Sequence, residues 1–120
     1  MSTIERKHTN ARMSKIVQHG GLVYLCGQTA TSSANANADI TAQMHETLSR
    51  VDALLTEAGS NREQILSATI YLKNIDDFAA MNAVWESWIV SRTAPARTTV
   101  EARLAAANLL VEVTVIASLG

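Results

Sequence analysis

Glu112 is the residue of this chain whose chemical type fits its surroundings least. It lies within 109–117, an otherwise apolar and largely β-branched segment. A carboxylate inside such a segment is costly unless it is paired or hydrogen-bonded. The ordinary explanation is an edge strand or a salt bridge to an arginine. The chemical alternative is a carboxylate that orients a water molecule and accepts its proton.

Arg97 is the second candidate, because it follows Pro95 and Ala96 where a loop meets a strand-like segment. A guanidinium presents a planar fork of donors that matches a carboxylate. An arginine at such a junction is more often a solvated surface residue. Its position alone therefore leaves both interpretations open.

Cys26 and Gly27 end another apolar segment, 22–26. A lone cysteine usually packs as a small apolar residue. Glycine has no Cβ, so the backbone at Gly27 can approach a ligand closely. These two residues are therefore candidates for lining a binding site.

Several common kinds of site are absent from the sequence. His8, His19 and His45 do not have the spacing of a metal-binding pair, and no second cysteine joins Cys26. Gly20-Gly21 is better explained as a turn than as a phosphate loop, and there is no Gly-x-Ser-x-Gly motif. We therefore expect no metal site built within one chain.

The elements that must position these residues can be read from hydrophobic periodicity. Two short strands, 14–17 and 22–26, flank the Gly20-Gly21 turn and predict a hairpin. The remaining strand predictions are 66–72, 97–104 with Arg103 on its polar face, and 109–117, buried on both faces. Two helices are predicted, one with Asp39 as its N-cap and Gly59 at its end, the other from 78 to 89.

Other local signals complete this picture. Thr29–Asp39 is predicted to be a surface loop, and Ser60 with Glu63 has the spacing of a capping box. The resulting order is β-β-α-β-α-β-β, which indicates an α+β domain with both helices on one face of a mixed sheet.

Composition limits the class of protein. The 120 residues are the size of one domain, and 48% of them are hydrophobic while 18% are charged. A net charge of −1 argues against a nucleic-acid partner, and no apolar run reaches the length of a membrane span. One cysteine favours the cytoplasm. So short a chain buries this much apolar surface poorly, so we expect a second subunit on the open face of the sheet.

Four segments taken together resemble the Rid (YjgF/YER057c/UK114) family of reactive-intermediate deaminases, as a divergent branch. The resemblance covers nearly the whole chain, as a single domain over 1–120. The segments are Leu22-Val23-Tyr24-Leu25-Cys26-Gly27-Gln28, Asn74 through Trp85, Pro95-Ala96-Arg97-Thr98-Thr99-Val100-Glu101 and Val111-Glu112-Val113.

The resemblance implies a fold, an assembly and an activity. The fold is a chorismate-mutase-like α+β unit, and three units form a homotrimer whose sheets enclose a barrel with clefts between subunits. The activity is hydrolysis of enamines and imines, such as 2-aminoacrylate and other 2-imino acids, to 2-oxo acids and ammonia. The family uses no metal or organic cofactor.

The resemblance also assigns roles to individual residues. Arg97 corresponds to the arginine that binds the substrate carboxylate, and Glu112 to the glutamate that holds the attacking water. Cys26 and Gly27 correspond to a Ser-Gly pair that lines the pocket, so Cys26 departs from the family serine.

Three further positions follow from the same resemblance. Thr99 corresponds to a residue whose backbone helps to position the water, and Asn82 to a pocket asparagine. Met13 stands where well-studied members have a pocket tyrosine, which leaves the substrate range and the level of activity open. The alternative function is a trimer that binds small molecules or regulates through the same cleft without turnover; RNA cleavage is disfavoured by the near-neutral charge.

Overall fold

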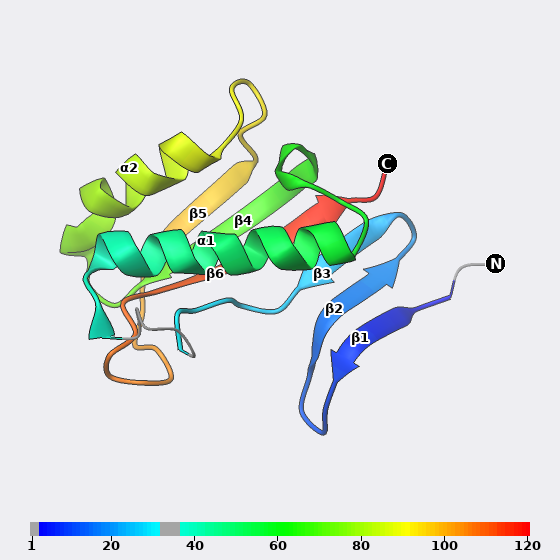
Figure 1. Ribbon diagram of the computed structural model, residues 1–120, viewed down its shortest axis with the longest axis horizontal. Coiled ribbons are helices and arrows are strands. Elements are labelled where there is room, and N and C mark those ends of the chain that lie inside the picture. The colour runs from blue at the N-terminus through cyan, green and yellow to red at the C-terminus, as the bar shows by residue number, and fades with distance from the viewer. Residues whose placement is uncertain (1–2, 32–36) are drawn as a thin grey trace.

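The computed structural model describes residues 3–31 and 37–120 (Figure 1). Its sheet has six strands in the order β1-β2-β3-β6-β4-β5, antiparallel except for the parallel pair β4 and β5. The strands are β1 Glu5–Thr9, β2 Ser14–His19, β3 Leu22–Leu25, β4 Ile65–Leu72, β5 Ala96–Glu101 and β6 Val111–Ser118. The helices are α1 Ile40–Glu57 and α2 Phe78–Trp88, with single 3₁₀ turns at Arg62–Gln64 and Ile75–Asp77.

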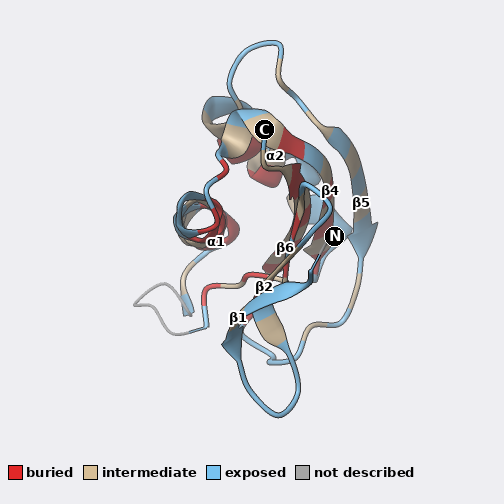
Figure 2. Cartoon of the chain, turned by 90° about the vertical axis from the view of Figure 1, so that its right-hand side faces the viewer, coloured by how far each residue is buried: buried red, intermediate tan, exposed pale blue. Residues whose placement is uncertain are grey.

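Both α-helices cover the same face of the sheet, which confirms the predicted mixed α+β architecture. Figure 2 shows the buried residues lying between the helices and the strands. Helix α1 begins where predicted, because the Asp39 carboxylate accepts a hydrogen bond of 2.9 Å from the Ala42 amide. Gly59 follows its last turn with φ 83°, a conformation that glycine adopts without strain.

The hairpin at Gly20-Gly21 is also confirmed. Both glycines have positive φ, 59° and 80°, and the flanking His19 and Leu22 are paired. A two-residue turn with positive φ at both positions matches the twist of antiparallel strands. This turn sets the register of β2 and β3, and Cys26 and Gly27 follow directly after β3.

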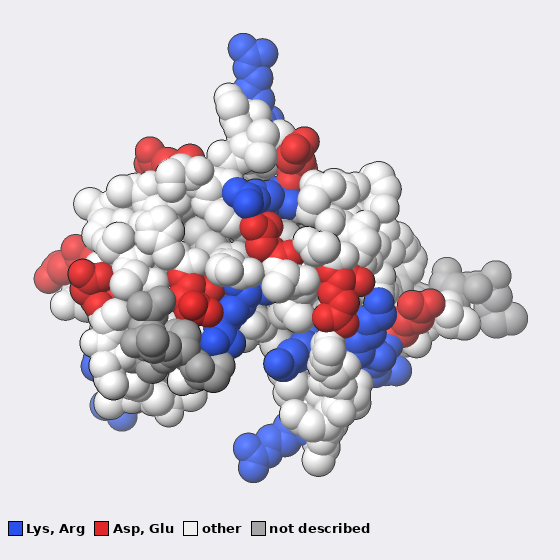
Figure 3. Space-filling view, in the orientation of Figure 1, with Lys and Arg blue, Asp and Glu red and all other residues white. Residues whose placement is uncertain are grey.

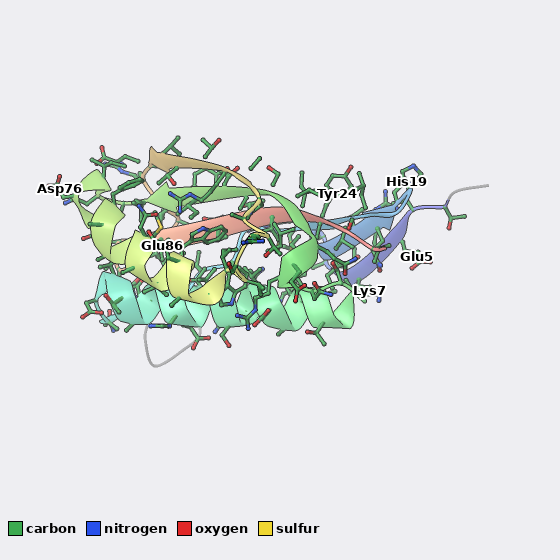
Figure 4. The ribbon with its side chains drawn as sticks, turned by 90° about the horizontal axis from the view of Figure 1, so that it is seen from above. Glu5, Lys7, His19, Tyr24, Asp76 and Glu86 are labelled. Atoms are coloured by element: carbon green, nitrogen blue, oxygen red, sulfur yellow. The ribbon has the colours of Figure 1, made fainter. Side chains whose placement is uncertain are left out.

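The pairing register assigns each side chain to one of the two faces. Ala68, Ile70 and Leu72 of β4 are buried beneath the helices with Val111, Val113 and Val115 of β6. The opposite side, here called the open face, carries Tyr24, Tyr71, Glu112, Thr114 and Ile116. Figure 4 shows Tyr24 on the side of the sheet away from the helices.

Three predictions about the elements were wrong. First, the predicted order of elements lacks β1, because the residues of Glu5–Thr9 are polar and show no apolar alternation. β1 is a charged edge strand, of the kind that discourages further pairing. The second concerns β6, which in one chain is buried on one face only, since Glu112 and Thr114 are half-buried. The third concerns Leu66, which is 48% exposed because a register shift between Ile65 and Ser67 turns it outward.

One local prediction also needs correction. Asn61, not Ser60, caps the turn that follows α1, since its side chain accepts from the Glu63 amide at 3.0 Å. Ser60 instead donates its hydroxyl to the Ser118 carbonyl oxygen at 2.7 Å. Part of the predicted loop Thr29–Asp39, residues 32–36, lies outside the described residues.

Candidate functional site

Glu112 lies on the open face of β6, opposite Tyr71 of β4, and is half-buried. The backbone after β3 runs directly beside it, because Gln28 and Val113 exchange two backbone hydrogen bonds of 2.9 and 3.0 Å. A Cβ atom added to Gly27 would lie 1.9 Å from Oε2 and 2.8 Å from Cδ of Glu112. Glycine at this position therefore leaves the space that the Glu112 carboxylate occupies.

Cys26 lies on the same face, next to Lys15 of β2, whose carbonyl oxygen accepts a 3.0 Å hydrogen bond from the Cys26 amide. Burial raises the pKa of the Cys26 thiol, and the Glu112 charge raises it further. The charge of Lys15 and a 3.2 Å hydrogen bond from Gln28 Nε2 to Sγ lower this pKa in part. Burial is the largest of these effects, so the pKa of the Cys26 thiol lies above its usual value, the opposite of the shift that activates a thiol.

A hollow of about 300 Å³ opens in front of Glu112. We call it the glutamate hollow; its lining includes Tyr71, Thr114, Arg103 and Leu104. From the sequence, Arg103 is expected on the polar face of a strand that continues to Leu104. In the structure β5 ends at Glu101, so Arg103 belongs to a loop and lines this hollow.

Arg97 lies on β5 with two aromatic rings of α2 beside it. Its guanidinium carbon is 5.5 Å from the centroid of Trp85 and 5.8 Å from that of Phe78. Burial lowers the pKa of Arg97, and the negative charge of Glu86 acts in the opposite direction. The flat rings restrict where the guanidinium can lie without consuming its hydrogen-bond donors.

Two polar atoms near this arginine are buried without a hydrogen-bond partner in the part of the chain that the structure describes. They are Asn82 Oδ1 and Thr99 Oγ1. Asn82 shares the face of α2 that carries Trp85, and Thr99 shares the face of β5 that carries Arg97. Buried polar atoms are normally satisfied, so this group is incomplete by itself.

One chain does not bring Arg97 and Glu112 together. In the register of β4, Arg97 pairs with buried Ala68 and therefore belongs to the helix-covered face. Glu112 pairs with Tyr71 on the open face. The sheet separates the two charges. A site that uses both must therefore take Arg97 from one copy of the chain and Glu112 from another, or the Arg97 side chain must reach around the edge strand β5.

Met13 is a third separate position. It lies in the turn between β1 and β2 and is 37% exposed. Its backbone is held by Asn10, whose Oδ1 accepts from the Met13 amide at 3.0 Å. The structure thus places Cys26, Gly27 and Glu112 together, gathers Asn82, Thr99 and Arg97 around α2 and β5, and leaves Met13 at a hairpin tip.

The described residues contain no group of three or more His, Cys, Asp or Glu side chains placed to hold a metal ion. Across residues 3–31 and 37–120, neither helix combines the length and the apolar character that crossing a membrane requires. Figure 3 shows acidic and basic side chains interspersed on the face that it presents.

Comparison with known proteins places the chain in a family. The sequence model described as Endoribonuclease L-PSP matches residues 3–119. The RutC family protein YoaB of Escherichia coli strain K12 is 40% identical over 116 residues, which cover 97% of this chain and 98% of that protein. A RutC family protein of Haemophilus influenzae is 38% identical with the same coverage.

Solved structures agree with the sequence matches. NMB1025 of Neisseria meningitidis, a member of the YjgF protein family, has a TM-score of 0.89 at 35% identity, covering 97% of this chain and 94% of that one. Rv2704 of Mycobacterium tuberculosis, a member of the YjgF/YER057c/UK114 family, has a TM-score of 0.82 at 26% identity, covering 98% and 99%. The resemblance inferred from the four sequence segments is thereby confirmed, and the chain belongs to the YjgF/YER057c/UK114 family, also called the Rid family.

Proposed function

We propose that this protein hydrolyses reactive enamines and imines of the 2-aminoacrylate and 2-imino acid type to 2-oxo acids and ammonia. The carboxylate of the substrate binds Arg97, and Glu112 positions the attacking water. The observation that carries the proposal is the Glu112 carboxylate, half-buried at a hollow and seated against a glycine that leaves room for it.

The chemistry needs only these groups. A protonated imine, R–C(=NH₂⁺)–COO⁻, reacts with water to give R–CO–COO⁻ and NH₄⁺. Water oxygen forms a bond to the imine carbon while Glu112 accepts a proton. Glu112 then returns the proton to nitrogen and the C–N bond breaks, which releases ammonia. As the carbonyl forms, Glu112 takes the hydroxyl proton and passes it to the ammonia, which leaves as NH₄⁺. No covalent nucleophile is needed.

The proposed assembly is a homotrimer in the cytoplasm. A partner copy that covers the open face would bury Tyr24 and Val100, which are 41% and 39% exposed in one chain. It would also bring the Arg97 of one copy near the Glu112 of another, which one chain keeps apart. A ligand carboxylate at Arg97 lies close to the face that carries the unpartnered Asn82 Oδ1 and Thr99 Oγ1.

The test uses imines generated in place by an amino-acid oxidase or a threonine dehydratase, with the remaining imine trapped by semicarbazide. Wild type is expected to accelerate imine loss. Arg97→Ala is expected to lower kcat/KM by about 100-fold through lost positioning, and Glu112→Gln to lower kcat by about 100-fold or more through lost base catalysis.

Arg92→Gln is the matched control, because Arg92 lies in the turn before β5 and belongs to neither group of residues. Imine decay that wild type leaves unchanged, or that is equal for wild type and Arg97→Ala, would overturn the proposal. If calorimetry shows that the protein binds a 2-oxo acid and no imine is turned over, the alternative function holds, a trimer that binds small molecules or regulates.

A further inference from the structure

Arg103 connects the glutamate hollow to a second hollow. The second one has a volume of about 410 Å³, and we call it the cationic hollow. Both are lined by Arg103 and Leu104, so the two spaces adjoin. The cationic hollow is otherwise lined by Lys73, Ala106 and Ala107.

The charges in the two hollows differ. The lining of the glutamate hollow has one acidic and one basic residue, Glu112 and Arg103, whereas the cationic hollow has two basic side chains and no carboxylate in its lining. Arg103 is exposed and has no ion-pair partner among the described residues. Lys73 Nζ donates to the Ala107 carbonyl oxygen at 2.5 Å, which leaves its other donors available.

The loop that carries Arg103 is fixed at both ends. The Ala102 amide donates to the Leu72 carbonyl oxygen at 2.8 Å, where β4 ends. The Lys73 amide donates to the Leu110 carbonyl oxygen at 3.0 Å, just before β6. The backbone on either side of the cationic hollow is thus tied to β4 and β6, the strands that carry Tyr71 and Glu112.

We propose that the cationic hollow is a second anion-binding subsite, and that the preferred substrates are imino acids whose side chain ends in a carboxylate. This inference rests on the proposed function. The substrate's 2-carboxylate binds Arg97, its imine carbon lies at Glu112, and its distal carboxylate reaches Arg103 and Lys73. Glu112 repels an anion in its own hollow, so the distal carboxylate is stabilised only beyond it.

The test compares two imines that differ only in the distal carboxylate. These are 2-iminoglutarate, made from glutamate, and 2-iminopentanoate, made from norvaline, each produced by an amino-acid oxidase. Wild type is expected to prefer 2-iminoglutarate by about tenfold or more in kcat/KM, the scale of one charge-assisted hydrogen bond. Arg103→Gln is expected to bring this ratio close to one, and Lys73→Gln to lower it less, because Lys73 is partly engaged by Ala107.

Arg92→Gln serves as the control, since it removes the same charge at the opposite end of β5, and it is expected to keep the wild-type ratio. Calorimetry with 2-oxoglutarate and 2-oxopentanoate tests the subsite without catalysis. Tighter binding of 2-oxoglutarate that is lost in Arg103→Gln supports the subsite even if no imine is hydrolysed, in which case only the proposed reaction fails. Equal binding of the two oxo acids by wild type, or an equal loss for both in Arg103→Gln, would overturn it.

Discussion

The absence of a side chain at Gly27 determines where the Glu112 carboxylate can lie. A methyl group at this position would overlap Glu112 Oε2 and Cδ, which form the movable end of a side chain. We therefore expect Gly27→Ala to displace the carboxylate and to lower kcat/KM by about 100-fold, as a misplacement of about 1 Å can do. The free energy of unfolding should change by less than about 1 kcal/mol, since no backbone atom has to move. Imine turnover and urea unfolding measure the two quantities.

A double-mutant cycle separates this effect from a general disturbance of the site. In the Glu112→Gln background, Gly27→Ala should lower turnover much less than in wild type, because both changes act on the same carboxylate. Additive losses, or full turnover in Gly27→Ala, would show that the position of Glu112 does not depend on Gly27.

The sequence anticipates some of this geometry and misses the rest. Glu112 stands out because a carboxylate within an apolar strand demands an explanation, and Gly27 because glycine allows a close approach. The separation of Arg97 from Glu112 depends on the pairing of β4 with both β5 and β6, which no local pattern records. Arg103 is missed because the alternation continues to Leu104 although β5 ends at Glu101.

At the scale of elements, Gln43 joins α1 to the segment that leads into β6. Its side chain is fully buried; Nε2 donates to the Asn108 carbonyl oxygen at 2.8 Å, and Oε1 accepts from the Leu110 amide at 2.9 Å. Gln43→Ala leaves a cavity in place of the buried side chain and removes a hydrogen-bond partner from two backbone groups, the Asn108 carbonyl and the Leu110 amide. We expect it to lower the free energy of unfolding by about 3 kcal/mol, measured by urea denaturation.

Thr41→Ala is the comparison on the same helix, because Thr41 is exposed near the start of α1. It should change the free energy of unfolding by less than about 0.5 kcal/mol. If Gln43→Ala were no more destabilising than Thr41→Ala, the bridge between α1 and β6 would contribute nothing to stability, and β6 would be held by sheet pairing alone.

Periodicity predicts those elements that bury one regular stripe of apolar residues. It finds α1 and β4 because their buried positions recur every three to four residues or every second residue. It fails for β1, a charged edge strand whose stability comes from backbone pairing with β2. For β6 the apolar composition suggests burial on both faces, while a single chain supplies a cover for only one.

At the scale of the molecule, the open face is the feature that a single chain leaves unfinished. It carries Tyr24 and Val100, both well exposed, and the half-buried Glu112. Since symmetric oligomers repeat the same contact in each subunit, a trimer closed through the open face would create three equivalent Arg97–Glu112 sites.

Mixed trimers test whether each site is shared between subunits. Arg97→Ala and Glu112→Gln are each expected to keep only about 1% of the wild-type activity. Co-refolding them in equal amounts should restore about a quarter of the wild-type activity, because that fraction of shared sites receives both intact residues. Light scattering should show an unchanged assembly with three times the mass of one chain. If Arg97 instead bends around the edge strand β5 to meet Glu112 of its own copy, no mixture can contain an intact site and activity stays at the level of the single variants. A monomer in solution would remove the shared site altogether, since the sheet of one chain keeps the two residues on opposite faces.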